Sequence, residues 1–309
     1  MNYRITGTGS CIPDITKKNS DFLENKFLDS DGGKFQTSNS EIIDKFNSIT
    51  GIYERRYAPD EINCSDLAAV AAGLAINDSK LDQETLDYII VAHNTGDISC
   101  SSGQVDTLPS VASKVKAKLK IKNPNCVAYD IICGCPGWVE GIIQAKSFIK
   151  SGMAEKCLVI GCDTLSRILD ENDRDSMIYA DGSGAIVLES DNSYDGGILS
   201  HKSATFTYEG ENDFIFYGTS YDTRKRTKSD QKFIKMQGRK VYEFALKNVP
   251  VAMKSCFDEA DCKIQDLKKI FIHQANQKMD EAIINRFFKL YKLSTPKDIL
   301  PMNIEEFGN

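Results

Sequence analysis

The hydrophobic and polar positions in the N-terminal part of the chain predict a helix followed by a strand. Ser65 is a favourable N-cap, and apolar residues recur after it at helical spacing as far as residue 75. A polar joint then leads into the apolar run 88–92, which ends at His93. A short apolar run bounded by polar segments is typical of a buried strand.

The same order of patterns returns in the C-terminal part of the chain. Residues 241–251 carry apolar positions at helical spacing, and an acidic joint separates them from the apolar run 270–272, which ends at His273. Because the two stretches repeat one order of elements, we expect a duplicated α/β unit in which each copy contributes its own layers.

The pattern of a β-α-β unit lies between these stretches. Residues 126–132 are predicted to form a fully buried strand, residues 136–150 a helix with one apolar face, and residues 156–162 a second buried strand. Strands that are joined through a helix run parallel. The sequence therefore predicts an α/β fold with a parallel sheet.

A polar, glycine-containing stretch at residues 191–197 is the predicted boundary between the two halves. We expect residues 1–190 to form the N-terminal half and residues 191–309 to form the C-terminal half. The basic stretch 223–232 follows neither the helical nor the strand period, so it predicts a loop.

Composition and charge narrow the classes of function. The chain has 309 residues, 41% of them hydrophobic, and its 38 basic and 44 acidic residues give a net charge of -6. A mildly acidic chain offers no broad basic surface, so nucleic acid and anionic membrane are not expected partners. No apolar run approaches about 18 residues, so no membrane-spanning helix is expected.

The cysteines and the start of the chain indicate a cytoplasmic protein. The first residues lead into a strand-like segment without the apolar core of a signal peptide. In the cytosol the ten cysteines should be mostly reduced and buried as small apolar residues. With no CxxC and only three histidines, no zinc site is expected, and no cofactor is predicted.

Cys135 is the first candidate for chemistry, because it lies between a predicted strand and a predicted helix. Pro136 suits the first helical position, and the turn should direct the thiol toward the helix N-terminus. Partial positive charge there stabilises a thiolate, so we expect a pKa below the free value of about 8.5. Backbone N–H groups can also hold an oxyanion. A buried, inert cysteine is the alternative, and Cys133 is a weaker candidate.

His273 is the second candidate, because it ends a predicted strand where α/β proteins place functional groups. A neutral imidazole in this position can donate a hydrogen bond or accept a proton. A structural histidine with satisfied hydrogen bonds explains the pattern equally well. His93 ends the corresponding strand of the first half and is the rival candidate.

An ordered set of short motifs extends over nearly the whole chain and resembles the β-ketoacyl-acyl-carrier-protein synthase III family of the thiolase superfamily. The motifs are Gly7-Thr8-Gly9-Ser10, Thr50-Gly51-Ile52, Tyr129-Asp130-Ile131, Cys135-Pro136-Gly137-Trp138, Asp173-Arg174, Asp181-Gly182-Ser183-Gly184-Ala185, Met236-Gln237-Gly238, His273-Gln274-Ala275-Asn276 and Gly308-Asn309. The resemblance favours Cys135 over Cys133 and His273 over His93. It implies a thiolase-like α/β fold with duplicated halves packed as an αβαβα layered sandwich.

The resemblance also implies a reaction and its residues. Cys135, His273 and Asn309 would be catalytic, and Arg174, Lys278 and Asn276 would bind substrate. Cys135 would take an acyl group from a primer such as acyl-CoA, and malonyl-acyl-carrier protein would then lose CO2 and attack the acyl-enzyme. The partners implied are acyl carrier protein, acyl-CoA and a second copy of the chain in a homodimer.

Three departures from the family pattern shape these expectations. The family's adenine-stacking tryptophan and an arginine before Thr50 have no clear counterparts in residues 45–49. Segment 95–108 is longer than in housekeeping members, which implies a specialised primer for a fatty-acid or polyketide-like product. The family continues after Asn309 with a helix and two strands, roughly forty residues by ordinary element lengths, so the C-terminal end is expected to be truncated.

Other functions remain open at this point. A non-catalytic thiolase-like subunit or fragment that binds acyl chains or a partner synthase is the main alternative. A relative of hydroxymethylglutaryl-CoA synthase would need an additional catalytic Glu, which the sequence does not identify. A chalcone-synthase-like enzyme shares the Cys-His-Asn set but lacks the context of His273-Gln274-Ala275-Asn276.

Overall fold

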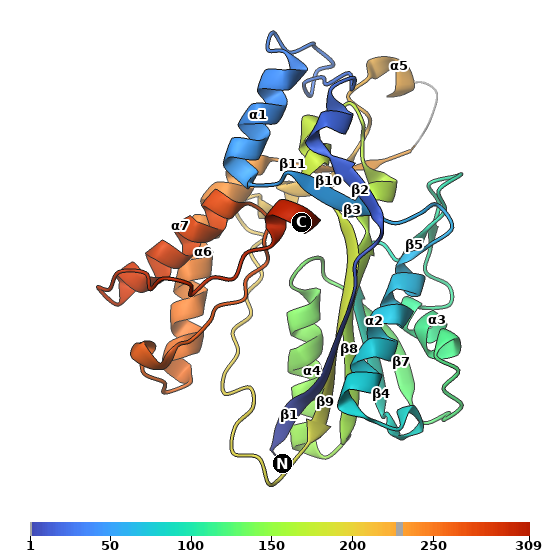
Figure 1. Cartoon of the computed structure of the whole chain (residues 1–309), viewed down its shortest axis with the longest axis vertical. Helices are drawn as coiled ribbons and strands as arrows, with labels where there is room; N and C mark the ends of the chain where they lie inside the picture. Colours follow the sequence, from blue (N-terminus) through green and yellow to red (C-terminus); the bar gives the residue numbers. More distant parts are fainter. Residues whose placement is uncertain (1, 227–230) are drawn as a thin grey trace. The chain divides into compact units, whose positions relative to one another are not determined.

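A computed structural model of the chain describes residues 2–226 and 231–309 (Figure 1). Their contacts divide into two compact units, and each unit combines several stretches of sequence. The first consists of Met1–Ile15, Arg56–Arg167 and Asp181–His201, and the second of Thr16–Arg55, Ile168–Ala180 and Lys202–Asn309. The predicted halves 1–190 and 191–309 stay a prediction.

A five-stranded mixed sheet forms the centre of the first unit, in the order β1-β9-β8-β4-β7. Its strands are β1 (Tyr3–Cys11), β4 (Tyr88–His93), β7 (Val127–Ile132), β8 (Lys156–Thr164) and β9 (Asp181–Ser190). Strands β8, β4 and β7 run parallel, whereas β9 is antiparallel to both β8 and β1. The predicted β-α-β unit is confirmed, since α4 (Gly137–Ser151) connects β7 to the parallel strand β8.

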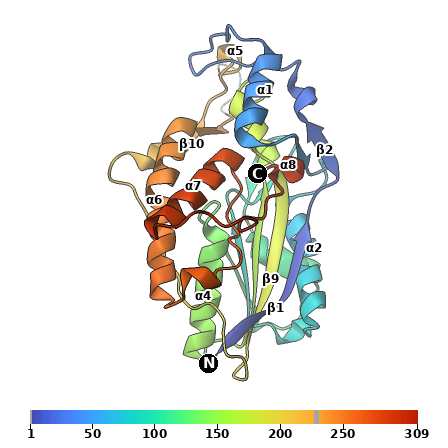
Figure 2. The same ribbon diagram turned by 60° about the vertical axis from the view of Figure 1, so that its left-hand side comes forward.

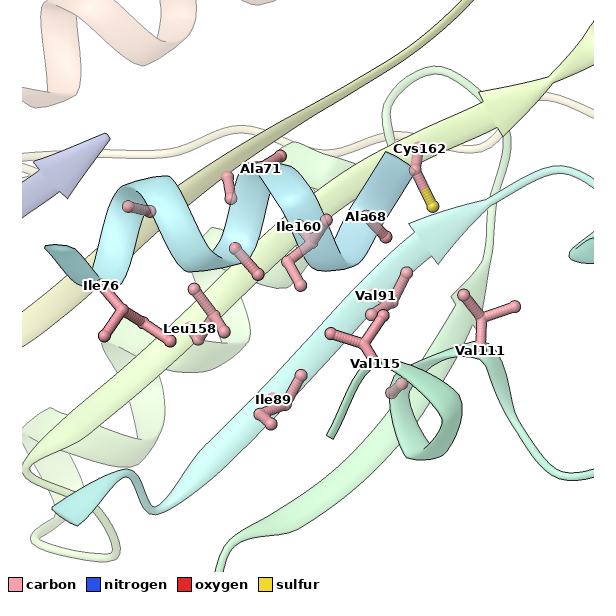
Figure 3. Packing of buried hydrophobic residues seen from close by; sticks show 14 of the residues in the cluster. Ala68, Ala71, Ile76, Ile89, Val91, Val111, Val115, Leu158, Ile160 and Cys162 are labelled. Atoms are coloured by element: carbon pink, nitrogen blue, oxygen red, sulfur yellow. The ribbon is translucent and has the colours of Figure 1, made fainter. Parts of the chain in front are cut away.

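Helices cover both faces of this sheet. The helices are α2 (Cys64–Ser79), α3 (Val111–Lys118) and α4, and a short hairpin pairs β5 (Asp97–Ile98) with β6 (Val105–Asp106). On one face, Leu158 and Ile160 of β8 pack with α2 and α3 (Figure 3). The alternate residues Cys157 and Val159 pack with α4 on the other face. The alternation follows from the strand period of two.

Helix α2 lies unusually close to strand β1. A Cβ atom at Gly7 would overlap the backbone oxygen of Ala75, and one at Gly9 would overlap that of Ala71. The facing positions of α2 are alanines, which are fully buried. Small residues on both sides therefore set the distance between helix and strand, because no larger side chain fits between the two backbones.

Two local predictions for this unit are wrong. Asn63 rather than Ser65 precedes α2 as its N-cap, with Asp66 completing a capping box. Strand β7 is not fully buried, because it is an edge strand of the sheet. Its terminal residues Val127 and Ile132 are 48% and 72% exposed. Hydrophobicity alone could not distinguish an edge strand with apolar ends from a central strand.

The second unit contains a helical core and two small sheets. Strands β2 (Ile15–Lys18) and β3 (Glu54–Tyr57) include residues of both units. The other elements are α1 (Asn39–Thr50), β10 (Ile215–Gly218), α5 (Thr223–Arg226), β11 (Phe233–Met236), α6 (Gly238–Glu259), α7 (Gln277–Leu290) and α8 (Ile304–Phe307). Strand β2 pairs with β3, and β10 pairs with β11. The predicted loop 223–232 begins with α5, and residues 227–230 lie outside the described part of the chain.

Helices α6 and α7 lie side by side and form the core of this unit (Figure 2). Ala245 and Leu246 of α6 pack against the apolar face of α7, which carries Ile283 and Phe287. The helix predicted over residues 241–251 is confirmed as part of α6. The strand predicted at residues 270–272 is wrong, because these residues belong to no strand. The Ile270 N–H bonds to the Ile299 oxygen at 2.8 Å outside any sheet, and Phe271 is 84% exposed.

A buried ion cluster ties β11 to residues 170–173 of the same unit. The Lys235 Nζ lies 2.7 Å from Asp170 Oδ2 and 3.0 Å from Asp173 Oδ2, and the Lys235 side chain is 1% exposed. The ammonium also lies 3.5 Å from the centre of the Tyr221 ring. Burial raises the pKa of Asp170, but bonds from Lys235 and from the Tyr221 N–H outweigh it, so the pKa lies below its ordinary value.

The distribution of cysteines differs from the prediction. All ten are free, and only Cys64, Cys126, Cys157 and Cys162 are buried. Cys100, Cys133, Cys135 and Cys262 are exposed. Across residues 2–226 and 231–309, the longest helices are too short or too polar to cross a membrane.

Candidate active site

Cys135 lies in the turn between β7 and α4, as the sequence predicts. Gly134 adopts a positive φ of 65°, and the N–H of Gly137 bonds to the Gly134 oxygen at 2.9 Å, which closes the turn. Helix α4 begins at Gly137, so Pro136 is its N-cap rather than its first residue. Cys135 is an exposed residue at this end of the helix by solvent accessibility, although the protein atoms around its sulfur partly desolvate the thiol. The turn therefore places Cys135 directly before the N-cap of α4.

The predicted lowering of the Cys135 pKa is wrong. Burial raises the pKa of the thiol above its ordinary value, and the negative charge of Asp163 raises it further. The thiol's own backbone N–H lowers the pKa, but by less. A helix N-terminus stabilises a thiolate only as far as nearby charges and desolvation allow. The resting side chain is therefore a thiol at neutral pH.

Asp163 is the last residue but one of β8, and its side chain is bound by Asn94. Its two carboxylate oxygens accept hydrogen bonds from the Asn94 N–H at 2.8 Å and from Asn94 Nδ2 at 2.6 Å. A Cβ atom at Gly134 would lie 3.3 Å from Asn94 Oδ1, so Asn94 contacts the turn. Burial raises the pKa of Asp163 to about 6, although Asn94 and His93 lower it.

His93, the alternative candidate to His273, is buried in the interior of the first unit. Its ring is 1% exposed, and Nε2 lies 3.1 Å from Asp130 Oδ2 on the neighbouring strand β7. Asp130 also accepts the N–H groups of Val111 and Ala112 at the start of α3, each at 2.8 Å. Burial raises the pKa of Asp130, but these bonds outweigh it and lower the pKa. The pair thus joins β4, β7 and α3.

His273 lies in the second unit, three residues before the N-cap of α7. Asn276 is that N-cap, and its Oδ1 accepts the N–H of Met279 at 3.1 Å. Gln274 accepts the N–H groups of Asn303 and Ile304 at 2.9 and 3.0 Å, which fastens the segment to the start of α8. Residue 273 is exposed by solvent accessibility, yet the protein atoms around the imidazole partly desolvate it and lower the pKa of His273 below its ordinary value, and Asp280 opposes this shift. A neutral imidazole is therefore favoured at pH 7.

The other predicted site residues also belong to the second unit. The backbone oxygen of Asn309 accepts the N–H of Ala180 at 2.7 Å. Lys278 is exposed on the first turn of α7. The Arg174 guanidinium lies 4.8 Å from the centre of the Phe35 ring and 4.0 Å from Asp175. The structure thus places Cys135 in the first unit and His273, Asn276, Lys278, Arg174 and Asn309 in the second.

Two carboxyl groups near these residues were missed in the sequence. Asp163 follows the apolar run of β8, and the rule that functional groups gather at the carboxyl ends of strands would have found it. Asp280 occupies a position on the buried stripe of α7 together with Met279 and Ile283. An acidic residue on an apolar stripe was the signal there.

Neutralising Asp163 is expected to make Cys135 more reactive. In Asp163→Asn, the carboxylate that raises the thiol pKa is absent, so more thiolate is present at pH 7.5. Alkylation of Cys135 by iodoacetamide should become about threefold faster or more, as measured by peptide mass spectrometry. Alkylation of exposed Cys133 in the same samples is the internal control. An unchanged or slower rate at Cys135 would contradict the assigned influence of Asp163.

Comparison with known proteins identifies the family. The family model for 3-oxoacyl-[acyl-carrier-protein (ACP)] synthase III matches residues 129–205, which include the Cys135 turn. The chain is 31% identical to the beta-ketoacyl-[acyl-carrier-protein] synthase III of Porphyra purpurea and 33% identical to that of Acholeplasma laidlawii. Both comparisons cover 100% of this chain and 86% of the relative. The chain belongs to the β-ketoacyl-acyl-carrier-protein synthase III family.

The structural comparison agrees. The crystal structure of 3-oxoacyl-[acyl-carrier-protein] synthase III from Aquifex aeolicus matches with a TM-score of 0.77 and 28% sequence identity. The match covers 100% of this chain and 86% of that structure. The predicted thiolase-like α/β fold is thereby confirmed, and the chain is an enzyme of the acyltransferase type. Within the described ranges, His, Cys, Asp and Glu form no group of three or more that could hold a metal ion.

Proposed function

We propose that the chain catalyses the decarboxylative condensation of an acyl primer with malonyl-acyl-carrier protein, in the cytosol. The observation that carries this proposal is Cys135, an exposed residue at the N-terminus of α4, in a chain of the synthase III family. The ten free cysteines agree with a compartment that keeps thiols reduced. The product would be a β-ketoacyl thioester for fatty-acid or polyketide-like synthesis.

The first half-reaction would be acyl transfer to Cys135. The sulfur attacks the primer's thioester carbonyl, its bond to carbon forms, and the bond to the leaving thiol breaks. The proton of Cys135 finally resides on the released thiol, such as CoA. Because the resting pKa of Cys135 is raised, this step should accelerate as the pH rises above neutrality. The N-terminal N–H groups of α4 favour the oxyanion that forms.

The second half-reaction would be decarboxylation and carbon–carbon bond formation. Malonyl thioester releases CO2, and the enolate attacks the acyl carbonyl, which returns the Cys135 thiolate. We propose His273 and Asn309 as donors to the thioester oxygen on which negative charge develops. A lowered pKa keeps the His273 ring neutral near pH 7, so one ring nitrogen carries a proton to donate.

Substrate binding is proposed for Arg174, Lys278 and Asn276. Lys278 is an exposed cation, and the Arg174 side chain is 51% exposed, so both remain accessible to an anionic partner. CoA and acyl carrier protein both carry phosphate or carboxylate groups that such cations attract. The Asn276 side chain already caps α7, so its contribution to binding would come through the position of this segment.

We also propose that two copies pair along β7. It is an edge strand of the sheet, and Val127 and Ile132 expose much of their apolar surface. An exposed edge invites pairing with another chain. Light scattering should give twice the mass of a single chain, and the mass of one chain would contradict the proposed dimer.

Intact-protein mass spectrometry tests the proposed reaction. The purified chain is incubated with acetyl-CoA and longer acyl-CoA thioesters, and circular dichroism verifies folding. We expect one acyl adduct per chain, located on the Cys135 peptide, and its loss when malonyl-acyl-carrier protein is added. A parallel incubation uses a carrier protein that bears the acyl group as the donor. A folded chain that gains no adduct from either donor would overturn the proposal and support the non-catalytic, acyl-binding alternative.

A further inference from the structure

Two residues at the carboxyl end of β4 contact the turn that carries Cys135. A Cβ atom at Gly134 would lie 3.3 Å from Asn94 Oδ1, and one at Gly137 would lie 3.1 Å from the Cβ of Ala92. Ala92 belongs to β4 and Asn94 comes directly after the strand, at the two-residue spacing of side chains on one face. The end of β4 therefore supports the turn on both sides of the cysteine.

Asp163 fixes the orientation of the Asn94 side chain. Its carboxylate accepts the Asn94 N–H at 2.8 Å and Asn94 Nδ2 at 2.6 Å. An ionised carboxylate accepts hydrogen bonds but cannot donate them, so the amide nitrogen must face Asp163 and the amide oxygen must face away from it. That oxygen is the atom that lies against Gly134. The pair of hydrogen bonds thus determines which end of the amide meets the turn.

Asp163, Asn94 and Gly134 follow one another across three neighbouring strands of the sheet. Asp163 lies near the end of β8, Asn94 directly after β4 and Gly134 two residues after β7, and the strands are ordered β8-β4-β7. All three residues belong to the first unit. Because Gly134 immediately precedes Cys135, a shift of this glycine also moves the thiol. Misplacement of a reacting group by about 1 Å can cost a large factor in rate.

We propose that Asn94 is a positioning residue for Cys135, which acts by holding the Gly134–Gly137 turn, and with it the thiol, in the place where the sulfur attacks a thioester. This inference rests on the proposed acylation of Cys135. Asn94 acts through the backbone of the turn, and Asp163 acts through Asn94. The effect of Asn94 should therefore appear in the rate of acyl transfer and not in the binding of the acyl donor.

Acylation kinetics test this role. In Asn94→Ala, acylation of Cys135 at saturating acyl-CoA should become about tenfold slower or more, with half-saturation within about twofold of wild type. Alkylation of Cys135 by iodoacetamide should not become slower, since this small reagent needs a thiolate but no fixed angle of approach. Thr95→Val is the matched control. It changes the next residue, whose buried hydroxyl has no hydrogen-bond partner in the described part of the chain, and should keep the wild-type rate.

Exchange of the two side chains tests the orientation of the amide. Asn94→Asp alone places two carboxylates against each other and should slow acylation as much as Asn94→Ala does. The double variant Asn94→Asp, Asp163→Asn again places an amide opposite a carboxylate, so its acylation rate should return to within about threefold of wild type. A loss of packing alone would not be recovered by this exchange.

Amide hydrogen exchange tests the inference without relying on activity. The Gly137 N–H is bound to the Gly134 oxygen, so it should exchange faster in Asn94→Ala and at the wild-type rate in Thr95→Val. Circular dichroism verifies folding, and Asn94→Ser replaces Asn94→Ala if that variant does not fold. Unchanged exchange at Gly137, or a double variant that recovers no acylation, would overturn the proposal. Faster exchange in a protein whose wild-type chain forms no acyl adduct would contradict only the proposed function.

Discussion

The Cys135→Ser variant is expected to form no acyl-enzyme and to lose condensation activity by roughly 10³-fold or more. A serine hydroxyl is a much weaker nucleophile than a thiol. The two histidines of the first unit contact other groups, since His93 is paired with Asp130 and His201 lies 3.5 Å from Lys146 Nζ. Intact-mass measurements after incubation with acyl-CoA should show the adduct on the wild-type chain alone, and steady-state rates give the loss in kcat/KM.

Cys133→Ser is the matched control for this experiment. Cys133 is also exposed and lies two residues earlier, at the end of β7. Its replacement should leave both the adduct and the rate within about twofold of wild type, because surface substitutions away from a site have small effects. A labelled acyl group retained in full by Cys135→Ser, or lost only in Cys133→Ser, would show that the nucleophile has been assigned to the wrong cysteine.

The Lys235→Met variant is expected to lower the free energy of unfolding by about 3–5 kcal/mol. Methionine keeps the apolar stem of lysine but leaves the Asp170 and Asp173 carboxylates buried without their cation. Chemical denaturation at pH 7, followed by circular dichroism, measures the change. The pKa of Asp170 is held below its ordinary value. The loss of stability should become smaller as the pH falls through this pKa, because a protonated carboxyl group is neutral and leaves no buried charge without a cation.

Two further variants separate the ion cluster from general effects of substitution. Lys232→Met removes an exposed lysine just before β11 and should change stability by less than about 0.5 kcal/mol. The triple variant Lys235→Met, Asp170→Asn, Asp173→Asn should recover part of the loss, since it removes the uncompensated charges. Equal effects of Lys232→Met and Lys235→Met would show that the cluster contributes nothing specific.

The sequence predicts the elements around Cys135 because their signals are local. Apolar runs and helical spacing over residues 126–162 are enough to place β7, α4 and β8 within a few residues of their observed bounds. The edge position of β7 and the coil at residues 270–272 depend instead on which segments pair in space. Tertiary contacts decide which strands pair, and the hydrophobic period within one segment carries no information on these contacts.

The electrostatics of the candidate site depend even more on distant residues. A helix N-terminus predicts a lowered pKa for Cys135, but desolvation of the thiol, and then the charge of Asp163 on β8, raise the pKa instead. The same holds for His273, whose pKa is lowered by desolvation that its motif does not reveal. The identity of the candidate nucleophile and of the histidine follows from motifs, whereas their protonation follows from packing.

The close approach of α2 to β1 has a consequence for recombination between relatives. At Gly7 and Gly9 the strand backbone meets the helix backbone near Ala75 and Ala71 without room for a methyl group. A chimera that takes α2 from one relative and β1 from another would combine a helix and a strand whose contacting residues need not fit each other. Crossovers between residues 11 and 64 should therefore be recovered rarely, and the strand and the helix should be inherited together.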